Sequence, residues 1–411
     1  MRFFLFLFLI PGIFNLNATE IEVCKSCKIS SIAEAVEIAV DGDVIRIKKG
    51  VYNEFDIKII NKSIRIVGED YPVIDAGMKG TAFSVQADNF TIEGLNIRNI
   101  GKSHTREFAA ILVANSTNFV IRNNILENIF FGILVERSSK GRITGNKVSS
   151  NATQQDNSGN GIHLFHSEEI HVSKNHVSGT RDGIYLEFAN NVVVSDNICK
   201  NNLRYGLHFM FSNDNEYLDN LFESNGAGVA VMFSKNIKMY RNVFRKSWGS
   251  ASYGLLLKEI NDAELKHNIF ESNTVGISAD GTNRINYIEN DFKNNGYGIK
   301  IRGACYKNVF TGNNFLYNAF DVAYSGLLNE NVFDRNYWSG YSGYDLDRDG
   351  TGDVPHRPVK LFSYLVNRSP EAIVMLRSLF IDIIDFSEKV SPIFTPAELI
   401  DANPKTRQIK W

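Results

Sequence analysis

The chain has 411 residues, and its 44 lysines and arginines against 46 aspartates and glutamates give a formal net charge of -2. This balance excludes the broad basic surface that nucleic-acid binding requires. The length fits two or three domains or one elongated repeat architecture, and an apolar content of 44% is enough for a large core.

The first residues are typical of an exported protein. Arg2 is followed by an apolar run that ends in small or polar residues, which predicts a signal peptide over residues 1–18. A retained membrane anchor is the alternative, but Pro11 and Gly12 interrupt the run, and it is short for a span. Bacterial export would place the mature chain in the periplasm, where thiols tend to oxidise.

Cys24 and Cys27 form a C-x-x-C pair just after this segment. A local disulfide is the simplest interpretation. A redox or metal role is the alternative, although no βαβ pattern of the thioredoxin type surrounds the pair.

Residues 19–43 predict an N-terminal segment with a capping helix that covers the open end of a sheet. Ser31 and Glu34 fit a capping box, and Gly42 fits the turn after the helix. One helical face would be apolar. Its residues are Ile32, Ala35, Val36, Ala39 and Val40.

Residues 44–340 are predicted to form a parallel β-helix, because a Gly-apolar-x-apolar motif repeats within them, mostly at steps of 22 or 23 residues. The motif begins at Gly132, Gly161, Gly183, Gly206, Gly228, Gly254, Gly276 and Gly298. A fixed period with β-type alternation and no helical pattern predicts a solenoid, in which each repeat forms one coil of a parallel β-helix. The fold class is therefore all-β, with coils stacked about 4.8 Å apart.

An asparagine recurs in phase with the glycine motif, and Val, Cys or a large ring follows it two residues later. The asparagines are Asn124, Asn146, Asn175, Asn197, Asn220, Asn242, Asn268, Asn290, Asn313 and Asn336. We expect each to occupy a turn that tolerates unusual backbone angles, and its amide to bond the asparagine of the next coil.

The second and fourth residues after each glycine are predicted to face outward. The second-position column reads Leu134, His163, Tyr185, His208, Ala230 and Leu256. The fourth-position column reads Glu136, Phe165, Glu187, Met210, Met232 and Lys258. Met210 and Met232 would then be neighbours on successive coils, with His208 about 7 Å from Met210 along the strand. His163 lies in the same column as His208, and His166 is close in sequence.

Thioethers select Cu(I), and imidazole suits copper in either oxidation state. The five candidate copper ligands are His163, His166, His208, Met210 and Met232. An exposed methionine is otherwise a poor choice in an oxidising compartment. An apolar stripe that binds a partner protein without metal is the alternative.

A catalytic interpretation competes with these, because parallel β-helices often host polysaccharide lyases and epimerases. His163, Tyr185 and His208, with Arg181, Asp182 and Glu187 nearby, would then act on a uronate. The apolar stripe and the lack of a dense lysine and arginine cluster argue against this alternative.

Residues 341–358 form an Asp/Gly-rich closing loop. Asp345, Asp347 and Asp349 alternate ahead of Gly350 and Asp353, a spacing that lets carboxylates converge on calcium. The alternative is a turn that only closes the solenoid, since His356 stands where an EF-hand loop needs Glu.

Residues 359–411 are predicted to be a partner-docking tail. Within it, residues 371–386 predict an apolar helix of about four turns, too short and too charged to span a membrane. The helix either packs on the solenoid end or docks on a membrane-bound partner. The last residues are predicted to be an extended arm that wraps a partner.

Several of these segments resemble the NosD family, periplasmic accessory proteins of nitrous oxide reductase maturation. The similar stretches are "AEAVEIAVDGDVIRIKKGVY", "YGLHFMFSNDN", "NYWSGYSGYDLDRDGTGDVPHRP" and "VKLFSYLVNRSPEAIVMLRSLFIDIIDF". The resemblance implies a right-handed parallel β-helix and a non-catalytic role.

The resemblance also implies partners. They are an ABC transporter with a membrane subunit and an ATPase, a copper chaperone lipoprotein, and nitrous oxide reductase, whose copper–sulfur centre the set assembles. It makes His208, Met210 and Met232 plausible places for transient copper, and places the chain in the periplasm at the inner membrane through its partner complex.

Overall fold

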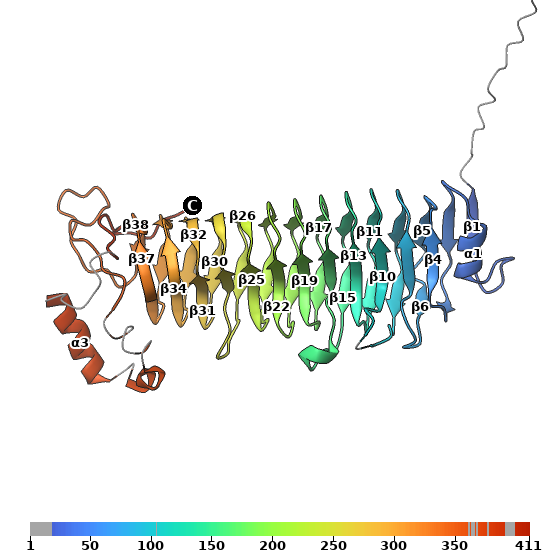
Figure 1. Cartoon of the computed structure of the whole chain (residues 1–411). Helices are drawn as coiled ribbons and strands as arrows, with labels where there is room; N and C mark the ends of the chain where they lie inside the picture. Colours follow the sequence, from blue (N-terminus) through green and yellow to red (C-terminus); the bar gives the residue numbers. More distant parts are fainter. Residues whose placement is uncertain are drawn as a thin grey trace, which may run out of the picture.

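The computed structural model describes residues 19–103, 105–360, 362, 366, 369–375, 378–390 and 399–411, so the predicted signal peptide lies outside the described residues. The chain winds into a right-handed parallel β-helix whose coils stack from helix α1 (Ile32–Ile38) toward helix α3 (Leu379–Val390) (Figure 1). The predicted fold class is confirmed.

Three rows of parallel strands form the faces of the solenoid. The first row contains β1 (Glu20–Val23), β2 (Val44–Ile47), β5 (Arg65–Gly68), β8 (Thr91–Glu93), β11 (Val120–Arg122), β14 (Arg142–Thr144), β17 (His171–Ser173), β20 (Val193–Ser195), β23 (Glu216–Leu218), β26 (Lys235–Tyr240), β29 (Asn261–Lys266), β32 (Asn283–Ile288), β35 (Val309–Thr311) and β38 (Val332–Asp334).

The second row contains β4 (Ile57–Ile60), β7 (Phe83–Gln86), β10 (Ala109–Ala114), β13 (Phe131–Glu136), β16 (Ile162–Phe165), β19 (Asp182–Glu187), β22 (Tyr205–Met210), β25 (Ala227–Met232), β28 (Leu255–Lys258), β31 (Val275–Asp280), β34 (Tyr297–Tyr306) and β37 (Phe320–Asn329).

The third row contains β3 (Val51–Tyr52), β6 (Val73–Asp75), β9 (Asn96–Arg98), β12 (Ile125–Glu127), β15 (Lys147–Ser149), β18 (His176–Ser178), β21 (Ile198–Lys200), β24 (Leu221–Glu223), β27 (Val243–Arg245), β30 (Ile269–Glu271), β33 (Asp291–Lys293), β36 (Asn314–Leu316) and β39 (Tyr337–Trp338). A short 3-10 helix, η1 (Gln155–Asn157), lies in the loop before β16.

The core is a set of columns in which like side chains stack from coil to coil. From Phe222 to Trp338, rings on successive coils are parallel, with centroids 4.2 to 5.4 Å apart. These are the rings that follow the recurring asparagine. Each coil alone would expose its apolar face, so stacking supplies the burial.

The recurring asparagines form the predicted ladder inside the solenoid. Asn220, for example, accepts hydrogen bonds from Asn197 and donates one to Asn242 Oδ1 over 2.9 Å. The unusual backbone angles belong to the preceding residue, such as Asp219 (φ 57°), and not to the asparagine. The reason is that the amide must point inward to pair, while its neighbour makes the turn.

Asp401 ends this ladder in place of an asparagine. Its Oδ2 accepts hydrogen bonds from the backbone and side-chain nitrogens of Asn336 and from Trp338 Nε1, and Asp401 is fully buried. The segment 399–411 therefore closes the solenoid, which corrects the expectation of a free arm. A carboxylate fits here because the last rung needs only acceptors.

Helix α1 covers the opposite end and buries Ile32, Ala35 and Val36. Ser31 accepts a hydrogen bond from Glu34 N, but the carboxylate that caps the helix belongs to Glu54, which accepts from the amides of residues 32 and 33. The helix ends at Ile38, so Val40 is exposed and does not join the predicted apolar face.

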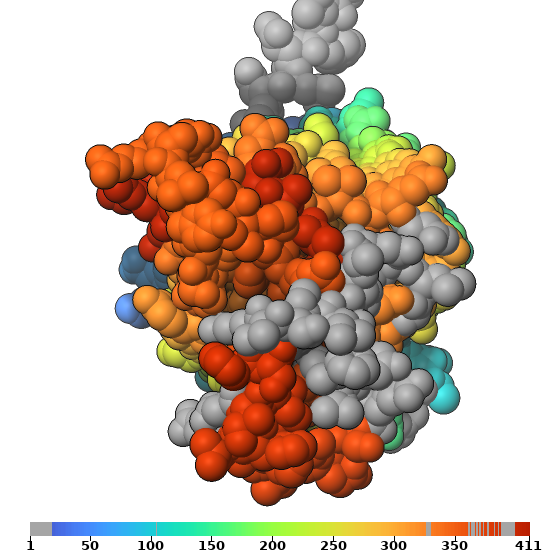
Figure 2. All heavy atoms as spheres, turned by 90° about the vertical axis from the view of Figure 1, so that its left-hand side faces the viewer, coloured from blue at the N-terminus to red at the C-terminus, as the bar shows by residue number. Residues whose placement is uncertain are grey.

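The predicted helix over residues 371–386 is divided in the structure. A 3-10 helix, η2 (Pro370–Met375), precedes α3. Ile381 of α3 packs in one cluster with Phe320 of the second strand row and with Phe362 and Val366 of the segment that precedes η2. Figure 2 looks onto this end, with the closing loop in orange and α3 in red below it.

Candidate functional site

Strands β22 and β25 carry the two methionines that the sequence predicted as copper ligands, and β19 lies beside β22. Their register pairs Glu187 with Met210 and Met210 with Met232, so the two thioethers lie on adjacent strands. Both methionines are half-buried. The Tyr185 hydroxyl donates a weak hydrogen bond to Met210 Sδ over 3.6 Å. The predicted adjacency of the two methionines is present in the structure.

His163, Tyr185 and His208 form a stack. The Tyr185 ring lies between the two imidazoles, with centroids 4.6 Å from His163 and 4.4 Å from His208. Ligands of one ion must bring their donor atoms to about 2 Å from it. The structure therefore does not bring His163 and His208 together on one ion.

Both imidazoles are buried, whereas an outward face was expected from the sequence. His163 is 5% exposed and His208 is 4% exposed, because Phe131 stacks against the first and the tilted ring of Tyr205 packs against the second. His163 Nε2 lies 3.5 Å from Glu187 Oε2, and His208 Nδ1 lies 3.4 Å from Asp182 Oδ2. The other ring nitrogens, His163 Nδ1 and His208 Nε2, have no hydrogen-bond partner among the described residues. Buried polar atoms without partners are uncommon and point to a function.

Asp182 and Arg204 form a buried ion pair beside His208. Arg204 Nε donates to Asp182 Oδ1 over 2.8 Å, and Arg204 Nη2 donates to Oδ2. Burial alone would raise the pKa of Asp182, but hydrogen bonds from Arg204 and His208 outweigh it and lower the pKa to about 2. Asp182 is therefore charged at neutral pH although it is fully buried.

His208 is held in its neutral form by the same environment. Burial lowers its pKa, and the nearby Asp182 carboxylate, 3.4 Å from Nδ1, only partly opposes this. Neutral imidazole is the form that binds metal ions. The ion pair of Arg204 with Asp182 was not predicted from the sequence, although the spacing of one coil between the two residues indicates that they are neighbours.

His166 lies outside this group. It is exposed in the turn after β16 and stacks on Phe188, with ring centroids 4.7 Å apart. It therefore does not converge with His208 or with the methionines on β22 and β25.

The groups that an enzyme would use are held in structural contacts. Asp182 is paired with Arg204, and Arg181 Nε donates to Asn160 Oδ1 over 3.2 Å. Burial raises the pKa of Tyr185 far above its ordinary value, which makes it a poor base.

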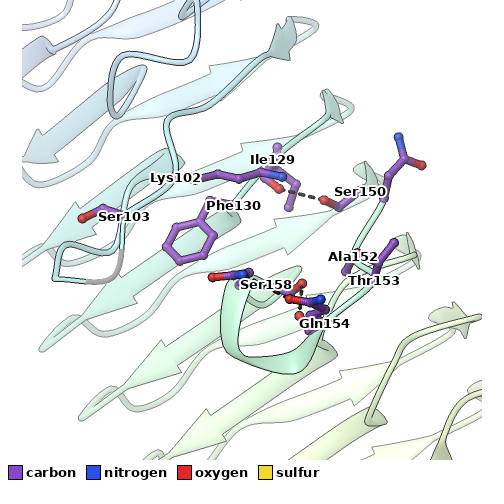
Figure 3. Close-up of a pocket in the computed structure, with 11 residues that line it drawn as sticks. Lys102, Ser103, Ile129, Phe130, Ser150, Ala152, Thr153, Gln154 and Ser158 are labelled. Carbon is purple, nitrogen blue, oxygen red and sulfur yellow. Dashed lines mark hydrogen bonds between the residues drawn. The ribbon is translucent and has the colours of Figure 1, made fainter.

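A polar cavity of about 380 Å³ lies beside the loop that contains η1. Figure 3 shows Lys102 and Phe130 on one side and Gln154 and Ser158 on the other. Its described lining residues include no carboxylate and no histidine, so they offer no acid–base pair.

Asp345, Asp347 and Asp349 in the closing loop each present one oxygen within 4.8 Å of the others. Asp345 Oδ1 is buried and has no hydrogen-bond partner. Asp353 is not part of this group, and its Oδ2 accepts a hydrogen bond from Leu346 N over 2.7 Å. Three of the four predicted carboxylates thus converge.

The remaining predicted features lie at the two ends. Cys24 and Cys27 are joined by a disulfide near α1. At the other end α3 exposes large apolar side chains, and no helix among the described residues has the length and apolar character needed to cross a membrane. The exposed residues are Leu379, Phe380, Ile383 and Phe386.

Sequence comparisons relate the chain to proteins of one family. The model of the family described as "Periplasmic copper-binding protein (NosD)" matches residues 150–343, and a right-handed β-helix model matches residues 14–179. A probable ABC transporter binding protein NosD of Pseudomonas aeruginosa is 28% identical, with 85% of each chain covered. A Stutzerimonas stutzeri protein of the same name is 27% identical, over 84% of this chain and 83% of its own.

Solved structures share the fold at low identity. The Yersinia enterocolitica family 28 exopolygalacturonase has a TM-score of 0.58 at 10% identity, covering 77% of this chain and 78% of its own. The Dettilon tailspike protein has a TM-score of 0.56 at 15% identity, covering 69% of this chain and 62% of its own. These likenesses concern the solenoid alone.

Proposed function

We propose that this chain, which is similar to the NosD proteins, is a periplasmic, non-catalytic scaffold that holds copper transiently while docked on an ABC transporter. The copper would serve the copper–sulfur centre of nitrous oxide reductase. The family description as periplasmic copper-binding and the relatives' names as transporter-binding proteins support the copper and the transporter. A copper chaperone lipoprotein is the proposed donor.

The observation that carries this proposal is the pairing of Met210 with Met232 on adjacent strands. Two half-buried thioethers side by side offer soft ligands, which favour Cu(I) over calcium or magnesium. His208 completes the proposed set, because it is neutral, belongs to the same strand as Met210 and has an unpaired ring nitrogen, Nε2. An open site of few ligands suits transfer, since a closed cage would hold the ion.

An anaerobic Cu(I) titration in competition with a chelator tests the site. Met210→Leu with Met232→Leu removes both sulfurs and keeps the side-chain volume, so we expect the Cu(I) affinity to fall roughly a hundredfold. Met78→Leu is the matched control, because Met78 is a half-exposed thioether on a distant coil. An unchanged affinity in the double variant would refute the site.

We propose α3 as the contact with the membrane subunit of the transporter, which associates with the ATPase. Ile381 fixes the helix to the solenoid, while Leu379, Phe380, Ile383 and Phe386 are more than half exposed. An apolar helix face of this kind fits a groove in a partner. The contact would hold the chain at the inner membrane.

Point variants test this contact better than truncation, since truncation would also remove Asp401 from the ladder. Phe380→Ser with Phe386→Ser should abolish co-purification with the membrane subunit and leave the melting temperature unchanged. Tyr317→Ser, at an exposed aromatic residue outside α3, is the control. Retained association in the double variant would refute the assignment of α3.

We also propose that Asp345, Asp347 and Asp349 bind calcium in the closing loop. The convergence of three carboxylates and the unpaired Asp345 Oδ1 support this proposal. Asp353 is left out of the ligand set, because it does not belong to the group of converging carboxylates.

A further inference from the structure

The turns that follow β16, β19, β22 and β25 carry an exposed stack of rings, which we call the aromatic edge. It consists of His166, Phe188, Phe211 and Phe233. Their centroids are 4.7, 5.2 and 5.1 Å apart, and the rings are within 15° of parallel. Phe188 and Phe211 are 39% and 41% exposed.

Neither the turn nor the core requires aromatic residues at these positions. All four have φ between 47° and 51°, a left-handed conformation that is unfavourable for bulky side chains. The turns of flanking coils place Arg137, Glu259 and Gly281 there with the same sign of φ. An exposed ring in a strained conformation, repeated on three coils, therefore needs another explanation.

The stacked geometry determines what the aromatic edge can bind. Each ring covers the faces of its neighbours, so the ring edges face the solvent. A sugar would stack on a ring face, whereas a thioether sulfur prefers the edge of an aromatic ring. The aromatic edge thus fits side chains of methionine better than a saccharide.

The aromatic edge is continuous with the proposed copper site. Met210 and Met232 directly precede Phe211 and Phe233 in sequence. Beyond His166 and Phe188 lies an open cavity of about 350 Å³, which Arg137 and Glu168 also line. A protein bound over these rings would therefore lie next to the two methionines.

We propose that the aromatic edge is the docking surface for a methionine-rich loop of the protein that exchanges Cu(I) with Met210 and Met232. This inference rests on the proposed function of the methionine pair. The loop would lie across the four rungs with its sulfurs against the ring edges and its bound ion beside the pair.

A fluorescent synthetic peptide with two M-x-x-M motifs tests the docking, measured by anisotropy with the mature protein and without copper. A twin peptide with norleucine in place of methionine keeps the shape and removes the sulfurs. We expect the methionine peptide to bind at least about tenfold more tightly than its twin. The triple variant Phe188→Leu, Phe211→Leu, Phe233→Leu should lose this preference.

Tyr317→Leu is the matched control, because Tyr317 is 77% exposed and also has a positive φ of 55°. The single variant Phe211→Leu serves if the triple variant does not fold. Equal binding of the two peptides by the unaltered protein, or an unchanged preference in the Phe variants, would overturn the proposal. Because this assay contains no copper, its failure is distinct from failure of the Cu(I) titration.

Discussion

The asparagine ladder inside the solenoid and the outer strip of β19, β22 and β25 follow the same coil period. They differ in whether their polar atoms have hydrogen-bond partners. Asn220 makes hydrogen bonds to Asn197, Asn242 and the carbonyl of Val194, so its amide is fully used. On the outer strip, His208 and the neighbouring His163 of β16 stack through Tyr185 in the same regular way, but His208 Nε2 and His163 Nδ1 have no hydrogen-bond partner among the described residues.

This difference indicates that the coil repeat serves two purposes, to stabilise the fold and to form a binding face. A ladder that satisfies every donor and acceptor stabilises the fold, because each buried amide replaces the water that it lost. A column that repeats rings and thioethers without satisfying polar atoms gives up stability at those positions, and this is typical of a binding face. Variants in each column test whether the asparagines stabilise the fold while the outer strip does not.

The largest expected effect is on the interior ladder. Asn220→Ala removes the acceptor of Asn197 N, one acceptor of Asn197 Nδ2, and the side-chain donor to the carbonyls of Val194 and Leu218. Since each buried unsatisfied group is costly, we expect the free energy of unfolding to fall by about 3 kcal/mol. Urea denaturation followed by circular dichroism measures this loss.

Asn53→Ala is the control for this variant, because Asn53 is exposed on a coil near α1. Its effect should stay within about 0.5 kcal/mol. A loss at Asn220 no larger than at Asn53 would show that the ladder is a consequence of the fold and not a source of its stability.

The next effect concerns the pH dependence of the outer strip. The pKa of Asp182 is about 2 in the folded protein, below its ordinary value of 3.8. Its stabilisation is therefore present above pH 4 and is lost as the pH falls from 4 toward 2. Over this range the free energy of unfolding of Asp182→Asn should fall by about 2 kcal/mol less than that of the unaltered protein.

Urea unfolding at pH 6 and pH 2.5 measures this difference. Asn220→Ala is the internal control, since an amide does not titrate and its cost should be the same at both values. If both variants respond equally to pH, the contrast between an uncharged ladder and a charged outer strip is wrong.

Much of this contrast was predictable from the sequence, because the period fixes the register. The spacing of Asn220 from Asn242 predicted the ladder, and the spacing of Met210 from Met232 predicted the adjacent thioethers. Period alone does not reveal how deep an outward side chain lies. His208 is buried because Tyr205 and Arg204, in the flanking positions, are large.

The ends of the solenoid were less predictable, because the repeat stops there. Asp401 fills the last rung from a segment 65 residues away from Asn336 in sequence, and no period relates the two. Glu54 likewise caps α1 from 22 residues away, where local pattern favoured Glu34. Contacts of this kind depend on the tertiary structure and have no local signal.

The smallest expected effect is the stability that calcium in the closing loop would add. The loop is hydrogen-bonded to the segment that ends the ladder, so this effect can be measured as a change in the free energy of unfolding. Asp345 Oδ2 accepts a hydrogen bond from Gly350 N, and Gly352 N bonds to Pro404 O in the segment that supplies Asp401. Calcium at tenfold its Kd should therefore raise the free energy of unfolding by about 1.4 kcal/mol. Asp347→Asn should remove this gain, and Asp156→Asn, at an exposed acid in the η1 loop, should keep it. Equal stability in calcium and in a chelator would mean that the three carboxylates only shape a turn, and that the ladder ends without help from a metal.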